Sequence, residues 1–260
     1  MCGIVATFNS NILNHKEISE CKNMLKTLEK RGPDATNFTL HDHLFLGHTR
    51  LSIIDTRVIS NQPFSDYEEN LSILFNGEIY NYEFLKEDLL KKGYKFKTTS
   101  DTEVVLNLYK EYSTKAFGLL RGMFSILFFD KLKNEILIVR DSVGIKPLYY
   151  YFNKKKLLVS SQVKTLIIAD IEKEIDFESK IDFYLMGYIV EPKTIFKNIK
   201  SLKSGSYMKF KLNKNDSIEL LENKKFDILL NEKNIDLSKA IEESIGYHLV
   251  SDVEVGLFLS

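Results

Sequence analysis

The sequence predicts an α+β fold, in which short strands and amphipathic helices share one chain. In the first 112 residues, apolar runs of strand length are interspersed with segments of helical periodicity. From residue 123 to 161 the pattern changes to four short apolar segments divided by polar turns, as in an antiparallel meander. The composition, with 44% hydrophobic and 28% charged residues among 260, is that of a globular protein with one large domain or two small ones.

The first expected elements are a strand and a capped helix. Residues 2–8 form an apolar run with β-branched side chains, which is typical of a buried strand. Asn14 and Glu17 have the spacing of a capping box, in which each side chain bonds the backbone N–H of the other residue. Apolar residues then recur at helical spacing over 18–28, and the RGPD segment at 31–34 ends this helix.

The middle of the chain predicts two strands followed by two helices. Strands are expected at 45–54 and 71–75, with Asn76 and Gly77 forming a turn directly after the second strand. Helices are expected at 82–92, where Gly93 acts as the stop, and at 102–112.

The remaining elements are the meander, two helices and two isolated strands. Residues 195–234 are rich in Lys, Asn and Ser, so this stretch is interpreted as a domain edge and a linker with a single strand. The expected strands are 124–130, 135–141, 147–152, 156–161, 207–212 and 255–260, and the expected helices are 176–188 and 236–249.

Charge, hydropathy and cysteine usage exclude several classes of protein. Lys+Arg and Asp+Glu both number 36, and this balance argues against a nucleic-acid partner, which requires a basic surplus. No stretch approaches the ~18 apolar residues of a membrane span, so no membrane partner is expected. Two cysteines in a chain without a recognisable export signal indicate a reducing, cytoplasmic location.

Cys2 is the most informative residue for chemistry. If Met1 is removed, Cys2 carries both a thiol and the free α-amine, whose pKa near ~7.7 lets it act as a base at neutral pH. Such an N-terminal nucleophile has its own proton acceptor and needs no histidine. The alternative is that Cys2 is a small apolar residue with only a packing role.

Seven segments, in this order and at these spacings, favour the catalytic interpretation of Cys2 over the packing one. They are residues 1–5 (MCGIV), 31–34 (RGPD), 47–55 (GHTRLSIID), 62–63 (QP), 75–81 (FNGEIYN), 100–104 (SDTEV) and 141–150 (DSVGIKPLYY). Together they resemble the class II glutamine amidotransferases, and among these the glutamine-hydrolysing asparagine synthetases. The resemblance implies the N-terminal-nucleophile hydrolase fold, an αββα sandwich of two antiparallel sheets between helix layers, over residues 1–195.

The resemblance also implies a glutamine pocket, with Cys2, Asn76 and Gly77 as the catalytic residues. Free glutamine carries a carboxylate, an ammonium group and a carboxamide. Arg50 is expected to take the carboxylate through a bidentate fork, and Asp101 and Glu78 to hold the ammonium group.

Each of these assignments has a plainer alternative. Arg50 can form a surface salt bridge, Glu78 and Asp101 can be charges at a helix terminus, and Ser100 or Asp101 can be a helix cap. The Asn76 amide and the Gly77 N–H are expected to face the oxyanion, the alternative being an ordinary Asn-Gly turn.

Other members of the expected site follow from the resemblance alone. Leu51 and Ile54 are expected to line the glutamine pocket. No metal and no cofactor is expected for the hydrolysis of glutamine.

The last ten residues resemble the segment that leads into the nucleotide loop of the synthetases. We therefore expect 235–260 to be the beginning of a truncated ATP-pyrophosphatase domain, after a linker at 196–234. ATP and Mg²⁺ are expected only for that missing synthetase domain, which would be the partner of this one in a longer protein. A homodimer is possible.

Several residues carry open alternatives. Cys21 is expected in the core, and His41 and His43 in a loop rather than at a metal site. His48 could serve Cys2 as a base in a self-sufficient acyl-transfer enzyme. A degenerate, non-catalytic module and an amidotransferase for another acceptor, such as a sugar precursor, also remain open. Ser142 and Gln162 depart from the family pattern, which has arginine and glutamate there, so ammonia transfer is in doubt.

Overall fold

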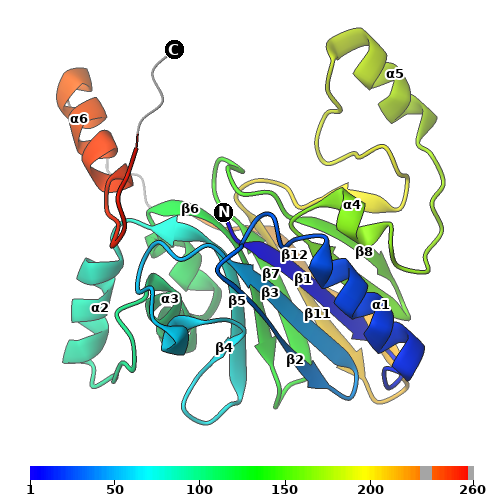
Figure 1. The fold of residues 1–260 in the computed structure, drawn as a ribbon, viewed down its shortest axis with the longest axis horizontal. Helices are drawn as coiled ribbons and strands as arrows, with labels where there is room; N and C mark the ends of the chain where they lie inside the picture. The colour runs from blue at the N-terminus through cyan, green and yellow to red at the C-terminus, as the bar shows by residue number, and fades with distance from the viewer. Residues whose placement is uncertain (229–235, 257–260) are drawn as a thin grey trace.

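Two six-stranded antiparallel sheets form the centre of the protein (Figure 1). The computed structural model describes residues 1–228 and 236–256. The first sheet has the order β10-β8-β9-β1-β3-β2 and the second the order β12-β11-β7-β6-β5-β4. The strands of the first sheet are β1 (Gly3–Asn9), β2 (Ala35–His41), β3 (Leu44–Arg50), β8 (Tyr149–Asn153), β9 (Lys156–Ser160) and β10 (Ile199–Ser201). Those of the second are β4 (Phe64–Ser65), β5 (Leu71–Ile79), β6 (Gly122–Asp130), β7 (Glu135–Arg140), β11 (Ser206–Asn213) and β12 (Ser217–Lys225).

Helices cover the outer face of each sheet. On the first sheet, α1 (His15–Lys26) and α4 (Val163–Leu166) bury Met24 and Leu166 in one apolar cluster with residues of β1, β3 and β9. On the second, α2 (Tyr82–Lys91) and α3 (Asp101–Tyr112) pack with residues of β5 and β6. A third cluster lies between the two sheets. The four layers confirm the αββα sandwich and the α+β class.

The burial of β1 explains its largely apolar sequence. Ile4, Ala6 and Phe8 point into the layer between the sheets, whereas Val5 points toward α1. Because both faces of this strand are covered, no position along it favours a polar residue in the way a half-exposed strand would. β1 therefore reads in the sequence as a continuous run rather than an alternating pattern.

The helices at the N-terminal end of the chain follow the sequence closely. Asn14 accepts a hydrogen bond from Glu17 N at 3.0 Å and the Glu17 carboxylate accepts one from Asn14 N at 3.0 Å, which confirms the capping box. Helices α2 and α3 lie where they were expected. Two short 3₁₀ segments, η1 (Val58–Ser60) and η2 (Ser113–Leu119), were not predicted.

Asn76 and Gly77 do not form a turn, as the sequence suggested. Strand β5 continues through both residues to Ile79, because β6 pairs with it along its whole length, from Leu71 opposite Asp130 to Ile79 opposite Gly122. A local Asn-Gly preference is overridden by the partner strand. In contrast, β3 ends at Arg50, earlier than the expected strand over 45–54.

Strands with polar sequences were missed. β2 exposes most of its side chains and pairs with β3 along its whole length, so His41 ends a strand rather than lying in a loop. The stretch after residue 195 holds three strands instead of one, since β10 pairs with β8 and β11 pairs with both β7 and β12. The sheets therefore extend to residue 225. Of the strand expected at 255–260, residues 255 and 256 are not in a strand and the others lie outside the described residues.

Two helices stand away from the sheets in Figure 1. Helix α5 (Phe177–Met186) projects on one side, and α6 (Leu237–His248) lies on the opposite side of the molecule, above α2. No helix in the part of the chain that the structure describes is long and apolar enough to cross a membrane.

Candidate active site

One cavity of about 480 Å³, with the open solvent at its mouth included, gathers every residue that the sequence placed in the site. Its walls come from the start of β1, the loop after β3, the end of β5 and the first turn of α3. The expected members are Cys2, Arg50, Leu51, Ile54, Asn76, Gly77, Glu78 and Asp101. These eight residues come from four separate parts of the chain, near positions 2, 50, 77 and 101, which the fold brings together.

The Cys2 thiol sits at the edge of this cavity, against the backbone of Leu51. Its Sγ lies 3.6 Å from the Leu51 carbonyl oxygen, to which it donates, and accepts from the Leu51 N–H at 3.4 Å. Arg31 holds the backbone at this point, because its Nε donates to the Cys2 carbonyl oxygen at 2.9 Å. Burial raises the pKa of the Cys2 thiol above its usual value. The thiol is therefore protonated at neutral pH, and a base must take its proton when it attacks.

The nearest amine belongs to the chain terminus. In this chain the α-amine is on Met1, which lines the same cavity, and the nitrogen of Cys2 is an amide without basic character. Burial lowers the pKa of the Met1 α-amine. Removal of Met1 would place a free amine on the residue that carries the thiol.

The Gly77 N–H lies on an open edge of β5. Tyr80 N donates to Arg121 O beside β6, so the N–H groups of residues 75, 77 and 79 face the other edge, as strand alternation requires. Along that edge, β4 pairs only with Ser72 and Ile73. The neighbouring N–H groups are capped by side chains: Phe75 N donates to Gln62 Oε1 at 2.6 Å and Ile79 N to Asp101 Oδ2 at 3.1 Å. Between them, Gly77 N has no acceptor among residues 1–228 and 236–256.

A glycine is required at position 77. A Cβ there would lie 2.2 Å from the Met123 carbonyl oxygen and 2.8 Å from Phe124 Cα, both in the backbone of β6. The preceding Asn76 is buried, and its Nδ2 donates to Ser125 Oγ over a long 3.5 Å. A side-chain amide and a free backbone N–H thus border the cavity side by side.

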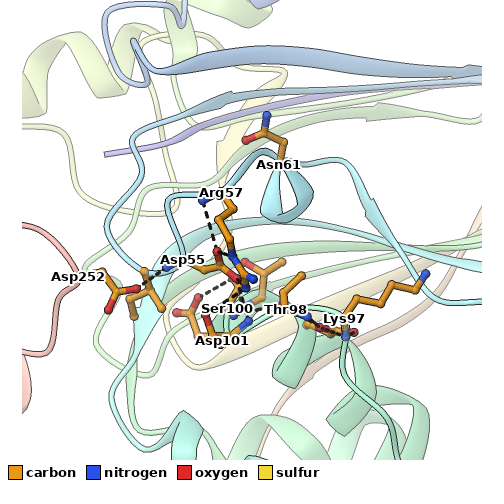
Figure 2. A network of polar contacts seen from close by, with 12 residues as sticks. Asp55, Arg57, Asn61, Lys97, Thr98, Ser100, Asp101 and Asp252 are labelled. Carbon is orange, nitrogen blue, oxygen red and sulfur yellow. Dashed lines mark hydrogen bonds and ion pairs between the residues drawn. The ribbon is translucent and has the colours of Figure 1, made fainter.

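Asp101 and Glu78 give the cavity an acidic wall. Ser100, not Asp101, caps α3, because its Oγ accepts from Thr102 N at 3.1 Å. Asp101 belongs to the polar network of Figure 2. It is buried, and burial raises the pKa of its carboxyl to about 7. Burial also raises the pKa of Glu78, which lies near Lys146. A cationic group between the two acids would relieve the unfavourable burial of their charges.

Arg50 donates more hydrogen bonds to the protein itself than the sequence predicts. Its Nη1 donates to Arg57 O at 3.0 Å and to Asn61 Oδ1 at 2.8 Å. Its Nη2 donates to Ile54 O at 3.2 Å and to Asp55 O at 2.5 Å. All four N–H bonds of the two terminal nitrogens are therefore used. In this geometry Arg50 fastens the loop after β3, and a fork to a bound carboxylate through Nη1 and Nη2 requires exchange with those acceptors.

Three polar residues of the site were not singled out from the sequence. In the sequence, Arg31 belongs to a helix end and to the 31–34 segment, and Gln62 and Lys146 belong to the 62–63 and 141–150 segments; none of the three has a role of its own there. Gln62 and Lys146 line the cavity, and both are buried. Their positions in the sequence do not predict that they line the cavity, because only the tertiary structure places them beside Phe75 and Glu78.

His48 is unsuited to serve as the base for Cys2. It lies outside the cavity, completely buried, with Nε2 3.1 Å from the Phe75 carbonyl oxygen. A carbonyl oxygen accepts only, so Nε2 carries the proton. Burial lowers the pKa of the imidazole to about 3. Cys21 lies in the core, where its Sγ donates to Thr7 Oγ1 at 3.2 Å, and this confirms its expected place.

The chain is similar to known proteins over its whole length. The sequence model of a family described as "Glutamine amidotransferase domain" matches residues 1–221. Two asparagine synthetases [glutamine-hydrolyzing] of Bacillus subtilis (strain 168), numbered 1 and 2, are 36% and 34% identical to it across the entire chain, which covers 42% and 37% of their lengths.

A solved structure shares the fold. Glutamine phosphoribosylpyrophosphate (PRPP) amidotransferase from B. subtilis matches 88% of this chain and 50% of its own, with a TM-score of 0.61 and 17% identity. This likeness supports the two-sheet fold. The chain spans about two fifths of the length of the synthetases that it matches.

Proposed function

The chain belongs to the glutamine amidotransferase domain family, and on this premise we propose that it hydrolyses glutamine to glutamate and ammonia through a thioester on Cys2. One observation carries the proposal. The half-buried Cys2 thiol, the free Gly77 N–H and the buried Asp101 carboxyl border a single cavity. A nucleophile, an oxyanion donor and an acceptor for an ammonium group are the parts that this reaction needs.

In the first half of the reaction, the Cys2 sulfur attacks the carboxamide carbon of glutamine. The α-amine freed by removal of Met1 takes the thiol proton, because the raised pKa of the thiol leaves little thiolate at neutral pH. The Gly77 N–H and the Asn76 amide stabilise the negative charge on the carbonyl oxygen. The proton then passes to the departing nitrogen, the C–N bond breaks, and ammonia leaves.

In the second half, water hydrolyses the γ-glutamyl thioester. The amine accepts a proton from water, the C–S bond breaks, and glutamate and the free thiol are restored. Asp101 and Glu78 hold the ammonium group of glutamine during both halves. Arg50 binds the carboxylate after exchanging part of its contacts with the loop, or through its Nε–H, which forms no bond with residues 1–228 and 236–256. Leu51 and Ile54 pack against the aliphatic part.

The test is ammonia release from glutamine. We expect protein lacking Met1 to release ammonia and Cys2→Ala to release none above the uncatalysed background. Cys21→Ala is the matched control, because it removes the other thiol of the chain. Equal release by wild type and Cys2→Ala would refute the mechanism. A variant that keeps one extra residue before Cys2 should be as inactive as Cys2→Ala, since its thiol has no amine beside it.

The fate of the ammonia is proposed from the longer relatives. Their names, asparagine synthetase [glutamine-hydrolyzing], support delivery of the ammonia to the synthesis of asparagine. We propose that a synthetase domain carries out this step by amidating aspartate, with ATP and Mg²⁺. We propose that residues 235–260 begin this domain and that it is the partner of the glutaminase domain. Similarity to asparagine synthetases does not favour a sugar precursor as acceptor. A homodimer is a further proposal, and two unpaired cysteines support a cytoplasmic location.

A further inference from the structure

Asp252, in the short segment after α6, holds two residues of the loop that follows β3. Its backbone N–H donates to Ile53 O at 3.0 Å, and its Oδ2 accepts from Asp55 N at 2.7 Å. Figure 2 shows Asp252 beside Asp55, at the end of the polar network that also contains Arg57 and Asp101. The two bonds bracket Ile54 from a position almost 200 residues later in the chain.

Asp55 adopts a conformation that needs such support. Its φ of 50° lies in the left-handed region, which is unfavourable for a residue with a Cβ. Each of its polar groups is held. The carbonyl oxygen accepts from Arg50 Nη2, and the carboxylate accepts from the Arg57 guanidinium and from Thr99 N at 2.8 Å. The N–H is the remaining group, and Asp252 is its acceptor.

The residues that Asp252 brackets form a wall of the glutamine cavity. Ile53 and Ile54 both line it, and Ile54 also packs into the core beneath. The Ile54 carbonyl oxygen accepts from Arg50 Nη2 at 3.2 Å. The same wall therefore supplies part of the hydrogen bonds that orient the Arg50 guanidinium. A shift of this loop would change the shape of the cavity and the acceptors around Arg50 together.

We propose that Asp252 is a positioning residue for glutamine binding, fixing the 53–55 wall of the cavity from the segment after α6. This inference rests on the proposed function. Asp252 touches neither Cys2 nor the cavity, so it acts on the affinity for glutamine and not on the chemical steps. Glutamine binding should also depend on the position of the segment after α6, because the hydrogen bonds of Asp252 join this segment to the cavity wall.

The experiment compares Asp252→Ala, Asp252→Asn and the control Glu254→Ala, which removes the same charge from an exposed position two residues on. We expect Asp252→Ala to raise the KM for glutamine three- to tenfold, as loss of one hydrogen bond predicts, with kcat within twofold of wild type. Asp252→Asn should restore most of the affinity, because its amide oxygen can still accept from Asp55 N. Glu254→Ala should match wild type.

Two further measurements separate this inference from the proposed function. Glutamine binding in the Cys2→Ala background should weaken by the same factor in Asp252→Ala, and the amide hydrogen of Asp55 should exchange faster. Wild-type ammonia release with an unchanged KM in Asp252→Ala would overturn the inference alone. A loss of kcat and thermal midpoint without a change in KM, or no rescue by Asp252→Asn, would also overturn it. Absence of ammonia release from wild type lacking Met1 would instead refute the proposed function.

Discussion

Replacing Asp101 with Asn should stabilise the protein at alkaline pH. The carboxyl is buried, and burial raises its pKa from 3.8 to about 7. A raised pKa in the folded state means that folding favours the protonated form. The contribution to stability is therefore complete below the pKa of the unfolded chain, near 4, and is lost as the pH rises through 7. Asparagine cannot ionise, so the variant escapes this loss.

The size of the effect follows from the two pKa values. Each tenfold change in proton affinity corresponds to about 1.4 kcal/mol. The interval from 3.8 to about 7 therefore disfavours the ionised Asp101 by about 4 kcal/mol in the folded protein. Most of this falls between pH 4 and 8. Relative to wild type, the free energy of unfolding of Asp101→Asn should rise by about 3–4 kcal/mol over that range.

Urea unfolding of both proteins at pH 4, 6 and 8 measures this difference directly. Ammonia release supplies the second readout, since the ionised Asp101 is proposed to hold the ammonium group of glutamine. The KM of wild type should rise by up to about tenfold for each pH unit below 7, whereas Asp101→Asn should have a high KM at every pH. A stability difference that stays constant from pH 4 to 8 would show that the pKa of Asp101 is not raised in the folded protein. The argument that burial of the acidic wall disfavours its charges would then fail.

The other predictions concern the proposed oxyanion donor, Gly77, and the identity of the base. Gly77→Ala should lower the free energy of unfolding, measured in urea, by about 1–3 kcal/mol, because its Cβ meets the Met123 carbonyl oxygen. The same variant should also lower kcat. The control is Gly246→Ala, which has open space around the Cβ and should be neutral or slightly stabilising. His48→Gln should keep kcat for ammonia release within severalfold of wild type, because its amide can still donate to Phe75 O; complete loss of activity in a folded His48→Gln protein would favour the imidazole as the base.

Local chemistry made part of this structure predictable. The capping box of α1 depends on two residues three apart, so the sequence contains all of its information. The apolar run of β1 was also recognisable, because a strand buried on both faces needs no partner to be identified. The grouping of Cys2 with Arg50 and Asp101 came from the family resemblance, and the cavity contains all three.

What was missed depends on partners far away in the chain. Gly77 has a turn-like neighbour, yet the pairing of β5 with β6 keeps it in a strand, where the same glycine is needed for close approach of the two backbones. β2 and β12 are largely exposed, so their side chains give little hydrophobic periodicity. The acceptors around Arg50 are mainly backbone carbonyls, whose positions no side-chain pattern encodes.

The hydrogen bonds around the cavity indicate where a substrate would bind. Along the open edge of β5, the protein itself caps the N–H groups of Phe75 and Ile79 and leaves that of Gly77 free. Gly77 is half-buried and borders the cavity, so its N–H is open to an oxygen that arrives with the substrate, whereas its two capped neighbours are not. The Asp101 carboxyl caps one neighbour and faces the same cavity. It therefore fixes the distance between the proposed oxyanion donor and the proposed ammonium site, which suits an amino acid whose amide lies at a set distance from its amine.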